Sequence, residues 1–561
     1  MTIQRFKFQP PPQTARATKA RVELFPMNRG FNPSIDALRL ERGEGSFIQN
    51  MTLREGYIEP RSGLSQPDAL EPAVETIDYM ARTFTTTAEE LIVIGNDEIH
   101  RTTSGQLFSY TTLTGPSLTS IDPITSSLDR YWDSANAYDA ATRQNLFVFT
   151  NGSNVANHPM IHNTGGTSYV TLDSFLSSGE SRAYLIEAFD DRLIFFKSVD
   201  SKGTLNNTRV RWSVRGDPSD FSNEGSGFED LFDMAGTGTA LVAEEGRLIL
   251  MSETEVWQAT PRRDAFSFDF DAIDRSIGCQ LPRSVVKTPI GVFFISGGLN
   301  LNRVAGSVIR PTSKKINNFL QNASAIGQIW CEYNEINRSL WVFFSKDERT
   351  TLDKGIDQAI EIYIDTLEPQ NDGTDDFEFV FHFFNNYHLT AGSQFFHSGD
   401  YAADVRGSSS LIVGSSKGTV LQFRSDQTTD SGTTFAAIWQ SPKLRSKDPN
   451  TKEAISEVWF DTGFETILGR SNRASGVPFS SRTATLEFFT SLDQGATFTN
   501  VGNVSINTID SLNTTSKFTT AFLAVTPQST QHPQFEIRIL DGSRPRLSAT
   551  RISLKQYTGR F

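Results

Sequence analysis

Seven short apolar runs recur along this chain of 561 residues, and they constrain its fold more than any other feature. Each run is a few residues long and rich in Phe, Ile, Leu and Val, and successive runs start 44 to 71 residues apart. Runs this short, bounded by Gly, Asn or Asp, suit buried central strands that end in turns. Periods of about 40 to 50 residues are typical of propeller blades. The runs start at Leu91, Leu146, Leu193, Leu248, Val292, Leu340 and Leu411.

This repeat predicts an all-β protein with a six- to seven-bladed β-propeller over residues 46–430. After about Asp430 the pattern changes to alternating strands with longer Ser/Thr/Asn-rich connections, which predicts an additional C-terminal antiparallel β-sandwich over residues 431–561. Residues 50–64, NMTLREGYIEPRSGL, are expected to supply a strand that closes the ring, since closure removes unpaired edges. Polar stretches near 345–376 predict inserted loops around an extra strand at 361–365. The best candidate for a helix is 313–322.

The charge balance is acidic, with 65 Asp and Glu against 52 Lys and Arg, a formal net charge of −13. A wide phosphate-neutralising surface is therefore disfavoured, although a repulsive wall would let DNA slide past without sticking. The two cysteines, Cys279 and Cys331, lie in apolar strand-like segments and are expected to be reduced and buried. No stretch approaches the ~18 apolar residues of a membrane helix, so we expect a soluble chain that does not insert into membranes.

Residues 1–45 are predicted to form a basic N-terminal arm. The first 22 residues carry five basic side chains and no acidic one, and their Pro, Gln and Thr content leaves little to bury. The segment is either a solvated terminus or an arm that becomes ordered against an acidic neighbouring subunit. The candidate interface residues are Arg5, Lys7, Arg16, Lys19 and Arg21.

Motifs that would carry chemistry are weak. His158 and His162 have the spacing of zinc ligands, but Pro159 stands where a zinc hydrolase has its Glu. The Asp-rich stretches at 269–274 and 371–376 lack the twelve-residue pattern of a calcium loop, and GDPSD at 216–220 reads as an Asp-Pro turn. We therefore predict no catalytic, cofactor-binding or metal-binding residues and no enzymatic activity.

One segment suggests an enzyme class. SLDQGATF at 491–498 resembles the Asp-box of sialidases, S-x-D-x-G-x-T-W, with Phe498 in place of Trp. In that motif the positions of Asp493 and Gly495 brace a β-hairpin and take no part in catalysis. The segment and the Phe-rich composition leave open an alternative function, a glycan-processing or glycan-binding propeller.

Several segments together resemble the nozzle, or tail-tube terminal, proteins of short-tailed bacteriophages. Near the start, Gly56, Arg61 and Gly63 fit a G-x-x-x-x-R-x-G pattern. In RVRWSVRGDPSDF, at 209–221, Trp212 and Ser213 precede an Asp-Pro turn. Further matches are LILMSETEVWQA at 248–259, the segment 277–307, and a weaker one at 439–444. The framework residues of the second segment are Arg209, Trp212, Ser213, Asp217 and Pro218.

The resemblance implies a virion protein of the tail, assembled in the cytoplasm of a bacterial host. Members of this family form a homohexameric ring below the portal and adaptor proteins, and the genome leaves through its channel. The implied partners are further copies of this chain, the tail adaptor, tail fibre or tailspike proteins, and double-stranded DNA in transit without sequence-specific binding. A third interpretation, a cellular propeller that recruits proteins, has only the fold in its favour.

Overall fold

The computed structural model divides the chain into two compact units, which we call the propeller unit (Ser62–Thr433) and the sandwich unit (Met1–Arg61 with Thr434–Phe561). The structure describes all residues except 1–15, 28, 34–35, 42–43, 55–56, 66–71, 73, 96, 104–109, 119–131, 153–157, 263–266, 322–328, 336, 345–355, 370–373, 385–387, 396–409, 425–428, 431, 445–451, 465–481, 492, 494, 509–518, 525–531, 541–544 and 559–561.

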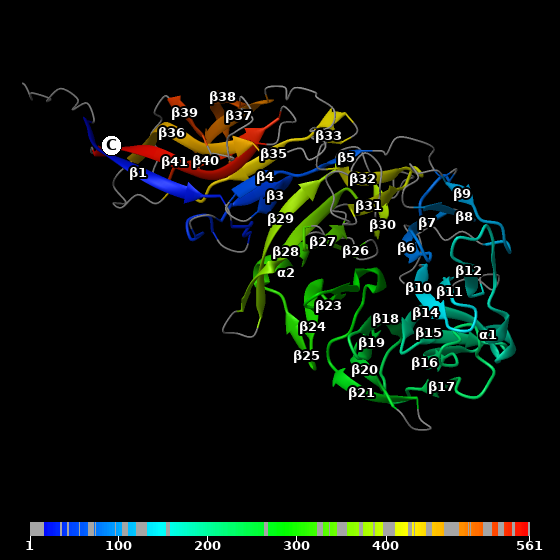
Figure 1. Cartoon of the computed structure of the whole chain (residues 1–561). Coiled ribbons are helices and arrows are strands. Elements are labelled where there is room, and N and C mark those ends of the chain that lie inside the picture. The colour runs from blue at the N-terminus through cyan, green and yellow to red at the C-terminus, as the bar shows by residue number, and fades with distance from the viewer. Residues whose placement is uncertain are drawn as a thin grey trace, which may run out of the picture. The chain divides into compact units, whose positions relative to one another are not determined.

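The propeller unit holds seven blades of four antiparallel strands, which follow one another in chain order (Figure 1). Blade 1 comprises β6 (Tyr79–Phe84), β7 (Glu89–Gly95), β8 (Glu98–Thr103) and β9 (Thr111–Thr112). Blade 2 comprises β10 (Asp133–Asp139), β11 (Gln144–Thr150), β12 (Met160–Asn163) and β13 (Tyr169–Thr171). Blade 3 comprises β14 (Glu180–Phe189), β15 (Arg192–Asp200), β16 (Leu205–Trp212) and β17 (Gly227–Asp230). Blade 4 comprises β18 (Gly238–Glu244), β19 (Arg247–Ser252), β20 (Val256–Pro261) and β21 (Phe268–Asp274).

The remaining three blades complete the ring. Blade 5 comprises β22 (Val286–Thr288), β23 (Gly291–Ser296), β24 (Asn300–Ala305) and β25 (Val308–Pro311). Blade 6 comprises β26 (Trp330–Asn334), β27 (Ser339–Phe344), β28 (Gln358–Pro369) and β29 (Asp375–Phe383). Blade 7 comprises β30 (Leu389–Phe395), β31 (Ser410–Ser415) and β32 (Val420–Arg424), with β5 (Gly63–Ser65) as its fourth strand. The first strand of each blade contacts the first strand of the next, and β30 contacts β6, so the ring is closed.

Each of the seven apolar runs forms the second strand of a blade, which confirms the predicted all-β propeller fold. A second strand pairs on both edges and is covered on both faces by neighbouring blades, so its residues are apolar without alternation. The hydrophobic core is accordingly split into clusters between adjacent blades, such as the one that joins Ile92 of blade 1 to Phe147 and Phe149 of blade 2. Each buried Phe contributes about 1.5 to 3 kcal/mol of transfer free energy.

The predicted inserted loops near 345–376 are partly wrong. The strand expected as an extra at 361–365 is the middle of β28, a regular third strand of blade 6 that pairs with β27 and β29. The polar residues before and after it hid the full length of the strand, and Glu361 within it is buried with four hydrogen-bonding partners, Asn337, Ser339, Tyr363 and His382. Residues 345–355 of the prediction lie outside the described residues. The predicted helix at 313–322 is confirmed as α2 (Lys314–Gln321), and short helical turns occur at α1 (Asp173–Ser177) and η1 (Pro282–Ser284).

The sandwich unit consists of two antiparallel sheets, which confirms the predicted second fold. One sheet has the order β3-β4-β41-β36-β39 with β1 also paired to β41, and the other has the order β2-β35-β40-β37-β38. Phenylalanine pairs join the two sheets: Phe25 and Phe535 have ring centroids 5.7 Å apart, and Phe460 and Phe488 5.9 Å. The strands are β1 (Arg16–Pro26), β2 (Phe47–Gln49), β3 (Met51–Arg54), β4 (Tyr57–Pro60), β35 (Ala437–Gln440), β36 (Lys452–Phe464), β37 (Arg482–Ser491), β38 (Thr499–Thr508), β39 (Thr519–Ala524), β40 (Gln534–Ile539) and β41 (Pro545–Thr558). A separate two-stranded sheet is formed by β33 (Thr429–Asp430), which belongs to the propeller unit, and β34 (Thr433–Thr434), at which the chain passes from one unit to the other.

The structure divides the chain differently from the predicted boundary on the N-terminal side. Strands β3 and β4, which the predicted 46–430 domain assigned to the propeller, belong to the sandwich unit, where Ile58 of β4 pairs with Leu547 of β41. The predicted arm at 1–45 contains strand β1, whose backbone pairs with β41 over its whole length. An edge strand needs few apolar residues, so the basic composition of this segment gave no sign that it forms a strand. The C-terminal boundary at Thr433 is close to the predicted 430.

Candidate interaction cleft between blades 3 and 4

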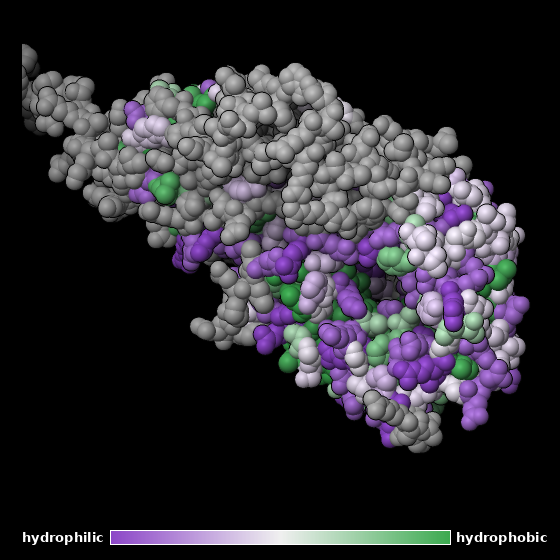
Figure 2. Space-filling view, in the orientation of Figure 1, coloured by the Kyte–Doolittle hydropathy of each residue, from purple (hydrophilic) through white to green (hydrophobic). Residues whose placement is uncertain are grey.

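A cleft of about 720 Å³ opens where the hydrophobic core between blades 3 and 4 reaches the surface. Its floor contains the buried residues Trp212, Leu231, Trp257 and Phe268, with Trp212 and Phe268 in an edge-to-face contact at 5.4 Å. At its rim, Phe228 is 49% exposed and Phe232 is 91% exposed. Figure 2 shows hydrophobic residues interspersed among hydrophilic ones on the visible face of the propeller unit. Exposed aromatic residues that continue a buried core are typical of an interaction surface.

Two outermost strands form the walls of the cleft, and each pairs on only one edge. Strand β17 pairs with β16, and β21 pairs with β20. Gly227 starts β17 beside the indole of Trp212, and a Cβ there would lie 2.9 Å from the ring, so the close approach requires glycine. The Nε1–H of Trp212 has no hydrogen-bond partner within the described part of the chain. A buried donor without a partner is costly, so the wall at this point is packed at the expense of a hydrogen bond.

Arg209 holds the blade 3 wall in place. Its Nε and Nη2 donate to the two carboxylate oxygens of Asp230 at 2.7 and 2.8 Å, and its Nη1 donates to Glu180 at 3.0 Å. Its guanidinium also stacks on the ring of Phe228, 4.5 Å from the centroid. These hydrogen bonds, the one to Asp230 foremost, raise the pKa of Arg209 above its usual value. The side chain links β16, β17 and β14, so it fixes Phe228 at the rim.

The charges around the cleft are predominantly acidic. Asp230 is neutralised by Arg209, and Asp269 pairs with Arg262 at 2.6 Å. Glu229 and Asp233 are exposed, and neither carboxylate makes a hydrogen bond or ion pair among the described residues. The cleft therefore combines an aromatic floor with two carboxylates available to a cation. Sequence reasoning missed Phe228, Phe232 and Trp257, although the alternation of aromatic and acidic residues in FEDLFD at 228–233 was a usable signal.

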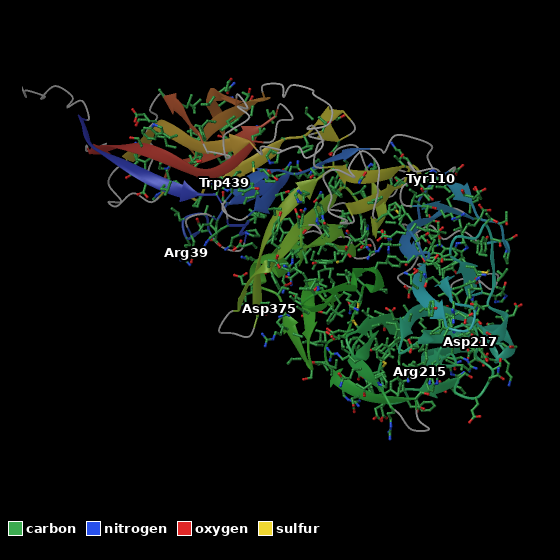
Figure 3. All side chains as sticks on the ribbon, viewed as in Figure 1. Arg39, Tyr110, Arg215, Asp217, Asp375 and Trp439 are labelled. Carbon is green, nitrogen blue, oxygen red and sulfur yellow. The ribbon has the colours of Figure 1, made fainter. Side chains whose placement is uncertain are left out.

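The segment 209–221 builds the turn next to this cleft. Ser213 is buried, accepts a hydrogen bond from the Leu193 amide at 2.9 Å and donates to the Val214 carbonyl at 3.1 Å. One carboxylate oxygen of Asp217 accepts from both the amide and the hydroxyl of Ser219, at 3.0 and 2.8 Å, around Pro218. Figure 3 labels Arg215 and Asp217, which lie beside the strands of blade 3. These contacts are those of a structural turn, and Trp212 is the residue of this segment that reaches the cleft.

The three residues of the G-x-x-x-x-R-x-G pattern, Gly56, Arg61 and Gly63, are divided between the two units. Gly56 lies outside the described residues. Arg61, in the sandwich unit, is buried, stacks on Phe435 at 3.9 Å, and donates from Nε to the Asn50 side-chain carbonyl at 3.2 Å. Gly63, in the propeller unit, starts β5, and a Cβ there would lie 2.2 Å from the Thr429 carbonyl oxygen. The pattern thus marks packing positions in two different units.

The Asp-box-like segment is a braced hairpin between β37 and β38 of the sandwich unit. Asp493 accepts hydrogen bonds from the Thr497 amide at 2.8 Å and the Thr497 hydroxyl at 2.6 Å, and a third from the Ser491 hydroxyl at 2.8 Å. Gly495 adopts φ +94°, which favours glycine, and its amide donates to Ser491 Oγ at 2.7 Å. The hydrogen bonds, those from Thr497 foremost, lower the pKa of Asp493 to about 2. Asp493 is thereby occupied in bracing the hairpin.

The candidate interface residues of the N-terminal arm have no described side chains. Arg5 and Lys7 lie outside the described residues, and Arg16, Lys19 and Arg21 are described only as backbone positions of β1. A solvated terminus and an arm that orders on a neighbour stay open for residues 1–15.

The histidine and acidic motifs are structural where they are described. His158 and His162 face different carbonyls, those of Ser181 and Ser168, at 2.7 and 2.9 Å. Within the described residues no group of three or more His, Cys, Asp and Glu side chains is arranged to hold a metal ion. The pentapeptide GSSKG at 414–418 has the letters of a nucleophile elbow, but it joins strand β31 to strand β32, whereas the elbow joins a strand to a helix. Cys279 and Cys331 are buried and unpaired, as predicted.

Polar side chains of the first strands connect neighbouring blades near the ring axis. The Tyr79 and Ser134 hydroxyls, from blades 1 and 2, are 2.9 Å apart, and Asp133 accepts from the Ile186 amide of blade 3 at 2.9 Å. Glu187 accepts from the Ala243 amide of blade 4 at 3.2 Å. Arg283, just before blade 5, donates to the Thr390 carbonyl of blade 7. We call Tyr79, Asp133, Glu187, Arg283 and Glu332 the axial cluster.

Burial dominates the protonation of the axial cluster. It raises the pKa of Asp133 to about 7, although the Ile186 amide opposes the change. It raises the pKa of Glu332 to about 8 against the pull of Arg283 and Arg82. It lowers the pKa of Arg283 to about 10, with Glu332 acting in the opposite direction. Asp133 and Glu332 therefore keep their protons to a higher pH than an exposed carboxyl does, which reduces the number of charges buried between the blades.

Comparison with known proteins leaves the family of this chain open. No protein-family model matches the chain, and no curated protein matches it in sequence. Among solved structures it is similar to an exo-β-1,3-galactanase from Phanerochaete chrysosporium, at 10% identity over 88% of this chain and 100% of that one, with a TM-score of 0.27. A likeness this weak says nothing about activity, and the fold rests on the strand pairing described above. Among the described helices, none has the length and apolar character needed to cross a lipid bilayer.

Proposed function

We propose that this chain is a structural subunit of the tail nozzle of a short-tailed bacteriophage, with several copies forming a ring through which the genome leaves. The observation that carries the proposal is the combination of a closed seven-bladed propeller with a separate β-sandwich, the kind of architecture that the sequence resemblance implies. The resembling segments 209–221, 248–259 and 277–307 form strands and turns of blades 3 to 5. In this role the chain has no catalytic task and needs no cofactor.

A conduit for DNA would have to lie between copies, because side chains of the axial cluster connect the blades across the middle of a single propeller. Arg283, between blades 4 and 5, reaches a carbonyl of blade 7 and is influenced by Tyr79 and Asp78 of blade 1. A duplex whose major groove alone is about 12 Å wide cannot pass a centre bridged in this way. The expected ring is a hexamer placed below the portal and adaptor, with fibre or tailspike proteins attached.

The net charge of −13 agrees with transit of DNA. A basic surface would release counterions from the phosphates and bind the duplex, and this binding would delay ejection. An acidic wall repels the duplex and leaves it free to move. The same charge argues against a role in sequence-specific recognition, which needs Lys and Arg at the phosphates.

The test is assembly. The purified full-length chain, alone and mixed with a candidate tail adaptor from the same genome, is analysed by size-exclusion chromatography with light scattering and by negative-stain microscopy. We expect ring-shaped oligomers that cap the adaptor, and virions lacking the chain that fail to retain or deliver DNA. A chain that stays monomeric with the adaptor and is absent from purified virions would contradict the proposal.

The alternative is a glycan-binding or glycan-processing propeller. The aromatic and acidic lining of the cleft favours it, because sugars stack on aromatic rings and donate hydroxyls to carboxylates. Turnover of a fluorogenic sialoside by the full-length chain tests the enzymatic version, and a glycan array tests binding. Activity or saturable binding that is lost in Phe232→Ser would favour this alternative over the nozzle.

A further inference from the structure

The cleft between blades 3 and 4 has the features of a receptor for a short extended segment. Phe228 and Phe232 at its rim are exposed, and two neighbouring carboxylates, Glu229 and Asp233, are free among the described residues. Its walls include two outermost strands, β17 and β21, each paired on one edge only. An added strand can hydrogen-bond to such an edge while its side chains enter the adjacent pocket.

The same chain contains a segment of complementary chemistry. Residues 4–8, QRFKF, alternate basic and aromatic side chains within an N-terminal stretch that has no acidic residue. In an extended segment Phe6 and Phe8 project from one side, about 7 Å apart, and Arg5 and Lys7 project from the other. Pro10, Pro11 and Pro12 lie in the sequence between this segment and β1, which begins at Arg16, and a proline-rich composition is typical of semi-rigid spacers.

We propose that residues 4–8 of one copy dock into the cleft between blades 3 and 4 of a second copy. Phe6 and Phe8 pack against the aromatic floor and Phe232, while Arg5 and Lys7 pair with Glu229 and Asp233. The inference rests on the proposed function, because the occupant is another subunit of the same ring.

Charge complementarity selects this occupant. The cleft has an acidic excess on a chain of net charge −13, so a random surface of another copy would be repelled. The first 22 residues carry five basic and no acidic residues, and the segment 4–8 within them alternates basic with aromatic side chains. Contacts of this size bury little area, so we expect each to be weak alone and to act cooperatively in a closed ring.

A charge swap tests the pairing in the full-length chain. Asp233→Lys and Lys7→Asp should each weaken assembly about tenfold in dissociation constant, as measured by analytical ultracentrifugation, and the double variant should recover most of it. Phe232→Ser should weaken assembly similarly, and because Phe232 is 91% exposed the fold should be unaffected. The matched control is Asp271→Lys, an exposed carboxylate on β21 outside the cleft lining, which should leave assembly unchanged.

Crosslinking identifies the occupant. A variant with Phe8→Cys and Phe232→Cys should form disulfide-linked chains of higher mass under oxidation, while the buried Cys279 and Cys331 stay unreactive. A crosslink within one chain would overturn the assignment to a second copy. If the wild-type chain forms rings and all of these variants form rings equally well, the docking is overturned. The proposed function would be unaffected by that result.

A peptide assay separates the two hypotheses when assembly itself fails. A fluorescent peptide of residues 1–15 is titrated with the full-length chain, with a Phe6→Ala, Phe8→Ala peptide as control. Saturable binding of the first peptide, lost in Phe232→Ser, supports the docking even if the chain stays monomeric and the nozzle proposal fails. Equal binding of both peptides, or none, would overturn it.

Discussion

At the scale of single residues, Arg209 shows how a planar cation can organise an edge strand. It holds Asp230 with two hydrogen bonds, reaches Glu180 with a third nitrogen, and covers Phe228. Lysine offers a single point charge and cannot reproduce this geometry. A residue that resemblance marked as framework thus supports the rim of the candidate cleft.

Removal of this cation should destabilise the propeller unit. Arg209→Ala leaves the carboxylate of Glu180, which is 3% exposed, without its ion-pair partner, with only the more distant charge of Arg211 nearby, and breaking a buried pair costs about 3 to 5 kcal/mol. Arg209→Lys should fall between this variant and the wild type. Urea denaturation followed by circular dichroism measures the loss. The control is Arg215→Ala, whose exposed pair with Asp190 should contribute at most about 1 kcal/mol.

Asp493 makes a contribution of a different kind, confined to one hairpin. Its folded pKa of about 2 lies below its usual value of 3.8, so its stabilising effect is present above pH 4 and is lost as the pH falls through 2. Asp493→Ala should accelerate hydrogen exchange at the Thr497 amide, which loses its acceptor, while the rest of the protein exchanges as before. Unchanged exchange at Thr497 would show that the hairpin does not depend on this carboxylate.

At the scale of elements, the ring is closed by three residues. Strand β5 pairs with β32, and the Leu64 amide donates to the Asp430 side chain at 3.0 Å. Leu64 is fully buried in the cluster between blades 6 and 7. The closing strand is therefore short, but it covers the otherwise free edge of β32 and completes the four strands of blade 7.

A side chain at the start of this strand should open the ring. In Gly63→Val the new Cβ would lie 2.2 Å from the Thr429 carbonyl oxygen, and backbone cannot yield as a side chain can. We expect the melting temperature of the propeller to fall by roughly 5 °C or more, since about 1 kcal/mol shifts a domain of this size by a few degrees. Val170→Ala, at an exposed position of β13, is the control and should melt like the wild type.

Sequence reasoning found the second strands of the blades but few of their outer ones. The second strands are apolar throughout, so they stand out as runs such as 146–149 and 292–295. An outer strand such as β17 or β9 is two to four residues long and partly exposed, and carries no periodicity. The cleft was not predicted for the same reason: Phe228 lies in the short outer strand β17, and Phe232 follows shortly after it. Strand β1 was not predicted because its basic residues indicated a solvated arm, whereas its backbone pairs with β41.

At the scale of the whole molecule, protonation couples to the closed ring. The raised pKa values of Asp133, about 7, and Glu332, about 8, mean that the folded propeller retains protons that the unfolded chain releases near pH 4. Their stabilisation is complete below that pH and is lost as the pH rises through 7 to 8. Asp133 and Glu332 lie on the first strands of blades 2 and 6, which contact the neighbouring blades. Their deprotonation should therefore lower the stability of the whole ring.

The propeller should accordingly melt at a higher temperature at pH 5 than at pH 8.5. A tenfold change in proton affinity corresponds to about 1.4 kcal/mol, so the two carboxyls together contribute on the order of a few kcal/mol. The double variant Asp133→Asn, Glu332→Gln should flatten this dependence in scanning calorimetry. Asp271→Asn, an exposed carboxylate away from the axis, should preserve it, and an unflattened profile in the double variant would assign the effect elsewhere.

Both units are completed by strands from opposite ends of the chain, β5 in blade 7 and β1, β3 and β4 beside β41. On the ribosome, the early strands therefore emerge long before their partners and must wait while the intervening blades are synthesised. The propeller unit cannot close until β32 has left the exit tunnel, and the sandwich unit cannot be completed until β41 has done so. A prematurely released polypeptide would expose unpaired strand edges, which favour aggregation.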